Sequence, residues 1–103
     1  MCGISGFVTR AFQPAHAEAL ARALDRLRHR GPDDERIHVT PDVALGFRRL
    51  SIIDLETGGQ PMSTPDGRFT LVMNGEIYNY REIRDDLTAR GVTFRTRSDS
   101  ESL

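Results

Sequence analysis

Hydrophobic residues recur along the first third of the chain at spacings that predict one strand and one helix. Residues 3–9 carry a short apolar run and predict a buried strand. Residues 14–30 predict an amphipathic helix, because apolar side chains recur there at i, i+4 and i+7 and share one face. Gly31 and Pro32 end this helix, since glycine suits the turn after a helix and proline cannot continue one. The residues of the apolar face are Leu20, Leu24 and Leu27.

The middle of the chain alternates between apolar and polar residues, which is typical of strands. Residues 36–40 and 43–47 alternate on either side of a turn at residues 41–42, so we expect them to form a hairpin. A strong turn signal follows at residues 65–67, where proline, aspartate and glycine stand together. Alternation then returns over residues 69–73 and predicts a further strand.

The last third of the chain carries two helix-start signals. Asn79 and Glu82 have the spacing of a capping box, which predicts a second helix that ends at Gly91. Residues 92–96 predict another strand, and residues 98–101 repeat the capping pattern. Because that last helix would begin at the end of the sequence, we expect the chain to be a piece of a longer domain. The order of elements predicts an α+β fold with antiparallel sheet.

Composition and charge then narrow the class of protein. The 103 residues suit one domain or part of one, and 38% of them are apolar. Fourteen basic and fifteen acidic residues are interleaved, so nothing in the charge pattern favours nucleic acid or an anionic membrane as partner. A single cysteine excludes a disulfide within the chain, and no apolar run reaches membrane-spanning length, so we expect a cytoplasmic protein. One cysteine and three scattered histidines give no metal-ligand spacing.

The single cysteine stands at position 2, where its chemistry depends on the fate of Met1. A small second residue such as cysteine generally permits removal of the initiator methionine. Cys2 would then carry both a thiol and a free α-amine. An α-amine accepts a proton near neutral pH and can therefore activate the thiol of its own residue as a nucleophile. The alternative is that Cys2 is an incidental residue at a frayed terminus.

Asn74 and Gly75 follow the alternating strand of residues 69–73 and have two compatible interpretations. Locally, asparagine followed by glycine is the strongest short signal for a hairpin turn. Functionally, the Asn74 side-chain amide and the Gly75 N–H could donate to the oxygen of a tetrahedral intermediate. Such an oxyanion hole is worth about 2.7–4 kcal/mol for each donor.

Five segments together resemble the class II glutamine amidotransferases, in the version found in asparagine synthetases. They occur in order and span nearly the whole chain, so their combination is far more specific than any single one. The segments are MCGISGF at residues 1–7, HRGPD at 29–33, RLSIID at 49–54 followed by QP at 60–61, NGEIYN at 74–79 and SDSE at 98–101.

The resemblance implies a fold and a reaction. The fold is that of N-terminal-nucleophile hydrolases, an α/β/β/α sandwich of antiparallel sheets that these 103 residues would form only in part. Cys2 corresponds to the nucleophile, and Asn74 and Gly75 correspond to the oxyanion donors. The reaction is hydrolysis of glutamine to glutamate and ammonia through a thioester on the cysteine.

Glutamine also needs partners for its two backbone charges. Its α-carboxylate suits a guanidinium, and Arg49 corresponds to that group in the family, whereas Arg48 should face the opposite side of the strand. Its α-ammonium suits a carboxylate, for which Asp99 is the family residue and Asp54 and Glu76 are alternatives. No chemical step is assigned to the 29–33 loop. The family also lines the glutamine site with Leu50, Ser51, Ile52, Ile53 and Glu76.

The resemblance further implies a partner domain that these 103 residues do not contain. In complete family members, ammonia reaches a synthetase domain where ATP and magnesium activate aspartate for conversion to asparagine. This chain is thus expected to need no cofactor of its own, and a homodimer is a further expectation. Two alternatives stay open, namely a related ligase that amidates another acceptor and a non-catalytic truncated domain.

Overall fold

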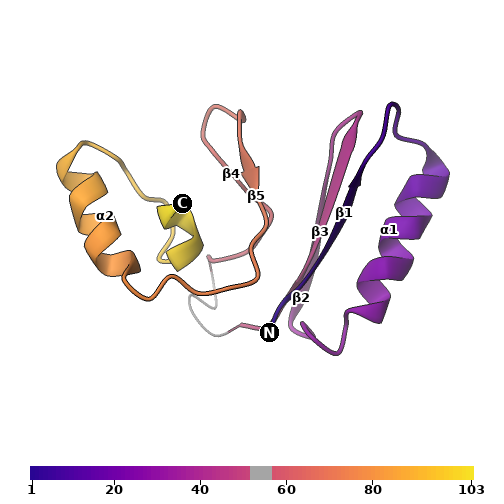
Figure 1. The fold of residues 1–103 in the computed structure, drawn as a ribbon, viewed down its shortest axis with the longest axis horizontal. Coiled ribbons are helices and arrows are strands. Elements are labelled where there is room, and N and C mark those ends of the chain that lie inside the picture. The colour runs from indigo at the N-terminus through magenta and orange to yellow at the C-terminus, as the bar shows by residue number, and fades with distance from the viewer. Residues whose placement is uncertain (52–56) are drawn as a thin grey trace.

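The first half of the chain forms a three-stranded antiparallel sheet with a helix along one face (Figure 1). The computed structural model describes residues 1–51 and 57–103. The strand order is β1-β3-β2, so β3 lies in the middle. The elements of this half are β1 (Gly3–Val8), α1 (Pro14–Arg26), β2 (Asp34–Val39) and β3 (Val43–Arg49).

The pairing of the strands confirms the predicted hairpin and determines which strand ends lie side by side. β2 and β3 pair antiparallel, with Val39 opposite Ala44. β1 pairs antiparallel with the other edge of β3, and Gly3 lies opposite Arg48. The start of β1 therefore lies beside the end of β3, which brings residue 2 next to residues 49 and 50 of the chain.

The core of this half forms between α1 and the sheet. Leu20 and Leu24 are fully buried against Ala44, as the apolar spacing of the helix predicts. Close approach of the helix depends on Gly46, since a Cβ there would lie 2.7 Å from Cδ1 of Leu24. Phe7 packs against the edge of the same cluster. Burial of these side chains holds α1 on one face of the sheet.

The predicted extent of the first helix is wrong at its end. α1 stops at Arg26 rather than at residue 30, and the chain continues in tight turns. The Arg30 N–H donates to the carbonyl of Leu27 at 2.9 Å, an i to i−3 bond. The chain leaves the helix early because Gly31 packs on β3, where a Cβ would lie 2.4 Å from the carbonyl carbon of Arg48.

The second half of the chain is a looser group of short elements beside the first (Figure 1). A two-stranded antiparallel ribbon precedes a helix and a final 3₁₀ turn. The predicted turn at residues 65–67 is confirmed, with Gly67 at φ 70°. The predicted strand over 69–73 keeps only two residues, and its partner strand was not predicted. The elements are β4 (Met62–Ser63), β5 (Thr70–Leu71), α2 (Tyr80–Ala89) and η1 (Asp99–Ser102).

Two local predictions fail in this half. Asn79 precedes α2, but its side chain makes no capping hydrogen bond, so the predicted capping box with Glu82 does not form. Residues 92–96 form no strand. There the carboxylate of Glu101 accepts the backbone N–H groups of Arg95 and Thr96, both at 2.7 Å. The Glu101 side chain therefore accepts from two backbone N–H groups that would otherwise donate to a neighbouring strand.

Only half of the capping box predicted at residues 98–101 forms. Ser98 does cap η1, since its Oγ accepts the Ser100 N–H at 3.2 Å. Glu101 turns to the preceding loop, where Thr96 Oγ1 also donates to it at 2.5 Å. Burial alone would raise the pKa of Glu101, but the Thr96 hydroxyl, two backbone N–H groups and the charge of Arg84 lower it below its usual value.

Candidate active site

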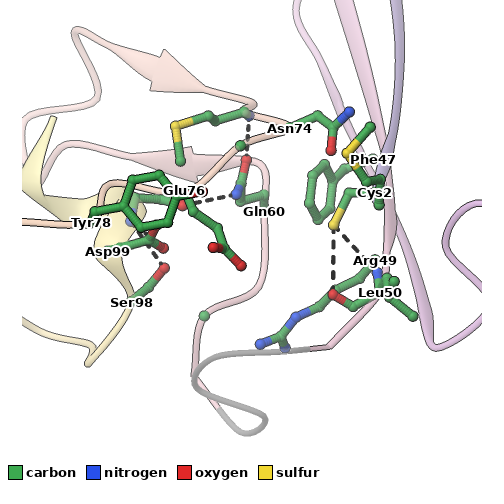
Figure 2. A pocket seen from close by; sticks show the side chains of 15 residues that line it. Cys2, Phe47, Arg49, Leu50, Gln60, Asn74, Glu76, Tyr78, Ser98 and Asp99 are labelled. Carbon is green, nitrogen blue, oxygen red and sulfur yellow. Dashed lines mark hydrogen bonds between the residues drawn. The ribbon is translucent and has the colours of Figure 1, made fainter. Parts of the chain in front are cut away.

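A cavity of about 380 Å³ lies between the two halves of the chain. It is open to solvent and is lined from both sides, by the end of β3 on one and by the loops around β5 and η1 on the other (Figure 2). Most of the residues predicted for the glutamine site meet here although they are far apart in sequence. The predicted residues that line it are Cys2, Arg49, Leu50, Asn74, Gly75, Glu76 and Asp99.

Cys2 is held at the cavity by backbone groups. Its Sγ accepts the Leu50 N–H at 3.3 Å and lies 3.6 Å from the Leu50 carbonyl oxygen (Figure 2). The side chain of Arg30 donates from Nε to the Cys2 carbonyl oxygen at 3.2 Å. The antiparallel pairing of β1 with β3 explains the first contact, and the turn after α1 explains the second. Cys2 is half-buried and is the only cysteine of the chain.

The loop of residues 29–33 supports this end of the site from outside the cavity. Asp33 accepts the Ser51 N–H through Oδ2 at 2.7 Å, so Ser51 is tied to this loop and does not line the cavity. His29 is exposed. The contact of Arg30 with the backbone of Cys2 was not predicted from the sequence, in which no chemical step was assigned to this loop. The available signal was an arginine directly before a glycine and a proline.

Arg48 and Arg49 point to opposite faces of β3, as their adjacent positions predict. Arg48 points toward α1, where its Nε donates to the Leu24 carbonyl at 3.2 Å and its Nη2 forms an ion pair with Glu35. Arg49 points into the cavity and is only 6% exposed. The two guanidinium groups therefore have separate surroundings, one in the core of the first half and one at the cavity.

Asn74 and Gly75 do not form the hairpin turn that their local pattern predicts. β5 ends at Leu71, and the chain runs through Asn74 and Gly75 toward α2 without returning to a partner strand. The short segment is tied at both ends. The Met73 N–H donates to Gln60 Oε1 at 2.5 Å, and the Ile77 N–H donates to Asp99 Oδ2 at 2.8 Å. Between these ties, Asn74, Gly75 and Glu76 are exposed along the cavity.

Asp99 lies at the start of η1 with its carboxylate at the cavity wall (Figure 2). It is 6% exposed. One oxygen accepts the Ile77 N–H, and the other accepts the Ser100 N–H at 2.9 Å. Asp99 is thereby held rigidly while it faces the space opposite Arg49.

Gln60 is a residue of this site that sequence reasoning missed. Its side chain is 5% exposed and lines the same cavity. Besides accepting the Met73 N–H, it donates from Nε2 to Ser100 Oγ at 3.1 Å. The sequence signals were its place between a glycine pair and a proline and its part in the QP segment at 60–61, to which no role was assigned. The hydrogen-bond partners of Gln60 could not be predicted from the sequence, because they lie 13 and 40 residues further along the chain.

Three residues predicted for this site cannot be placed relative to the cavity. Ile52, Ile53 and the alternative carboxylate Asp54 lie outside the described residues. Within residues 1–51 and 57–103, no group of three or more acidic, histidine or cysteine side chains is arranged to hold a metal ion. The same part of the chain contains no helix with the length and apolar character needed to cross a membrane.

Comparison with known proteins identifies the family of this chain. The glutamine amidotransferase domain family matches residues 1–103, so the chain belongs to that family. It is 46% identical over 106 residues to asparagine synthetase (glutamine-hydrolysing) 1 of Bacillus subtilis. It is 42% identical over 105 residues to a probable asparagine synthetase (glutamine-hydrolysing) of Dictyostelium discoideum. Both alignments cover 100% of this chain.

The match is to one portion of those relatives. The chain spans 17% of the length of the Bacillus protein and 19% of the Dictyostelium protein. A putative asparagine synthetase (glutamine-hydrolysing) of Mycobacterium tuberculosis is 42% identical over 120 residues, and 18% of its length is covered. The resemblance stated from the motifs is thereby confirmed, and this chain corresponds to the glutamine amidotransferase portion of such enzymes.

Proposed function

We propose that this chain hydrolyses glutamine to glutamate and ammonia, with Cys2 as the nucleophile. The observation that carries the proposal is the meeting of Cys2, Arg49, Asn74 and Asp99 at one cavity. They come from four separate segments of the chain. A thiol, amide donors, a guanidinium and a carboxylate are the groups that hydrolysis of a charged amino-acid amide requires.

The proposed reaction has two steps. After loss of Met1, the Cys2 α-amine takes the thiol proton, and the thiolate attacks the side-chain carbonyl carbon of glutamine. The resulting oxyanion accepts hydrogen bonds from the Asn74 amide and the Gly75 N–H. Collapse breaks the carbon–nitrogen bond, and the nitrogen takes up a proton and leaves as ammonia. Water then adds to the thioester, the carbon–sulfur bond breaks, and glutamate and the free thiol are released.

Substrate orientation follows from the charges around the cavity. Arg49 binds the α-carboxylate through its planar fork, and Asp99 binds the α-ammonium. The volume of about 380 Å³ lies at the small end of the range for ligand sites, which suits a single amino acid. Leu50 and Glu76 complete the wall. The family resemblance adds Ile52 and Ile53 as further predicted substrate-binding residues.

The names of the relatives support a use for the ammonia. We propose that it passes to a synthetase domain elsewhere in the full protein, where ATP and magnesium activate aspartate and asparagine forms. A ligase of another acceptor would use the same glutamine site, and assay of the full protein with different acceptors distinguishes the two. The homodimer and the cytoplasmic location stay predictions from the sequence.

The proposed fold is that of the N-terminal-nucleophile hydrolases. The sheet β1-β3-β2 is covered by α1 on one face only, and its other face carries apolar side chains. In register, Ile4 lies opposite Phe47 on that face, and Ile4 is 46% exposed. A second sheet packed against this face would complete a sandwich with helices outside.

The proposal is tested by intact mass after incubation with an electrophilic glutamine analogue. We expect a single adduct on Cys2 of protein lacking Met1, and none on Cys2→Ala. Glutamate release from glutamine should be lost in Cys2→Ala while its circular dichroism is unchanged. Unchanged glutamate release by that variant would overturn Cys2 as the nucleophile. If the intact full chain binds glutamine without hydrolysing it, the proposed enzymatic function is wrong and the domain is a glutamine-binding domain.

A further inference from the structure

The exposed segment that carries Asn74 and Gly75 has few contacts of its own, yet it must aim two donors at one point. Asn74, Gly75 and Glu76 are all exposed, and a Cβ on Gly75 would meet nothing closer than Cγ of Met73 at 4.0 Å. Packing by the part of the chain that the structure describes therefore does not hold this segment in place. Its position depends on the hydrogen bonds at its two ends.

Those end ties belong to one closed ring of hydrogen bonds. Gln60 accepts the Met73 N–H and donates to Ser100 Oγ. The Ser100 N–H donates to one oxygen of Asp99, whose other oxygen accepts the Ile77 N–H. The backbone from 73 to 77 closes the ring. Gln60, Asp99 and Ser100 are each buried, so little water competes for these bonds.

We propose that Gln60 is a positioning residue of the glutaminase site, which fixes the Asn74–Gly75 donors relative to Asp99. The proposal rests on the glutaminase function proposed above. The Gln60 side-chain amide contacts both segments. Its oxygen accepts from Met73, the residue before Asn74, and its nitrogen donates to Ser100, the residue after Asp99. Gln60 thus ties the oxyanion donors to the carboxylate that binds the substrate ammonium.

The consequence should appear in kcat more than in KM. Asp99 keeps its bonds to Ile77 and Ser100 when Gln60 is replaced, so ground-state binding of the ammonium survives. The Met73 end of the donor segment loses its only side-chain tie in the described structure. A displacement of about 1 Å at a reacting centre costs roughly 100-fold in rate. We expect Gln60→Met, which has nearly the same shape, to lower kcat by about 10- to 100-fold.

The test compares four proteins in the full chain: wild type, Gln60→Met, Ser100→Ala and Leu20→Ala. Leu20→Ala is the control for lost stability alone, because Leu20 lies on the buried face of α1 and does not line the cavity. Assays run well below the melting temperature of every variant. We expect kcat to fall in Gln60→Met, to fall less in Ser100→Ala and to be unchanged in Leu20→Ala, with KM within about threefold throughout. An unchanged kcat in folded Gln60→Met overturns the proposal.

Amide hydrogen exchange of residues 73–77 separates this proposal from the glutaminase function itself. Faster exchange in Gln60→Met, with no change in Leu20→Ala, supports the tie whatever the enzyme does. If wild type releases no glutamate, the proposed function fails, and the exchange result still decides whether Gln60 holds the segment. Unchanged exchange in Gln60→Met overturns the positioning role. A double variant with Ser100→Ala should lose no more than Gln60→Met alone, because both act through one ring.

Discussion

The backbone N–H of Leu50 points at Sγ of Cys2 at 3.3 Å and joins the first residues of the chain to the end of β3. The contact comes from a main-chain group, so it does not depend on the leucine side chain. It follows from the antiparallel register that places Gly3 opposite Arg48. The nucleophile proposed for this family is therefore positioned by sheet pairing.

This contact makes Cys2→Ser an informative variant. Serine keeps an acceptor for the Leu50 N–H, but its hydroxyl is a far weaker nucleophile than a thiolate. We expect glutamate release to fall by about 10³-fold or more while glutamine still binds. Isothermal titration with glutamine and a coupled glutamate assay measure the two effects. Loss of both binding and activity would instead indicate that residue 2 shapes the pocket.

The two adjacent arginines of β3 should separate substrate binding from stability. Lysine cannot reproduce the bidentate pair of a guanidinium with a carboxylate, so Arg49→Lys should raise KM for glutamine by about 10- to 100-fold. Arg48→Lys should leave KM unchanged and lower the melting temperature, because Arg48 binds the Leu24 carbonyl and Glu35. Steady-state kinetics and thermal melts of both variants provide the check. An equal rise of KM in the two would contradict the assignment of Arg49.

Gly31 should tolerate no side chain, although it lies outside the cavity. A Cβ there would lie 2.4 Å from the Arg48 carbonyl carbon and oxygen, which are backbone atoms that cannot rotate away. We expect Gly31→Ala to lower the free energy of unfolding by about 1–3 kcal/mol. Gly75→Ala is the matched control, since its Cβ would meet only Cγ of Met73 at 4.0 Å, an ordinary van der Waals distance. Urea unfolding of both proteins should show a shift in the first alone.

Glu101 makes the second half of the chain sensitive to acid. Its pKa in the folded protein lies below the usual 4.5, so its contribution to stability is complete above about pH 4.5. That contribution is lost as the pH falls through the folded-state pKa, because protonation weakens the bonds from Thr96 and Arg95. We expect the stability difference between wild type and Glu101→Gln to be greatest near pH 7 and to shrink below about pH 4.5. A difference that is constant from neutral to acidic pH would contradict this role.

Sequence patterns predicted the elements that depend on residues within one short segment of the chain. The leucines of α1, the hairpin of β2 and β3 and the turn at Gly67 each follow from spacing or turn chemistry within a few residues. The failures share a cause as well. Residues 92–96 form no strand because Glu101 accepts backbone N–H groups there. α1 ends before residue 30 because Gly31 packs against the backbone of β3. In each case a contact outside the local segment overrode the local preference.

By itself, the sequence determined the family, the individual candidates for nucleophile, donors and charges, and the face of β3 on which each arginine lies. Those properties depend on residue identity and on periods of two or 3.6 residues, which are readable along a chain. Only the tertiary structure decided that Cys2, Arg49, Asn74 and Asp99 surround one cavity, and that Gln60 ties two walls of it together. Strand register and side-chain hydrogen bonds across 13 to 48 residues produce that convergence, and no local pattern encodes such partners.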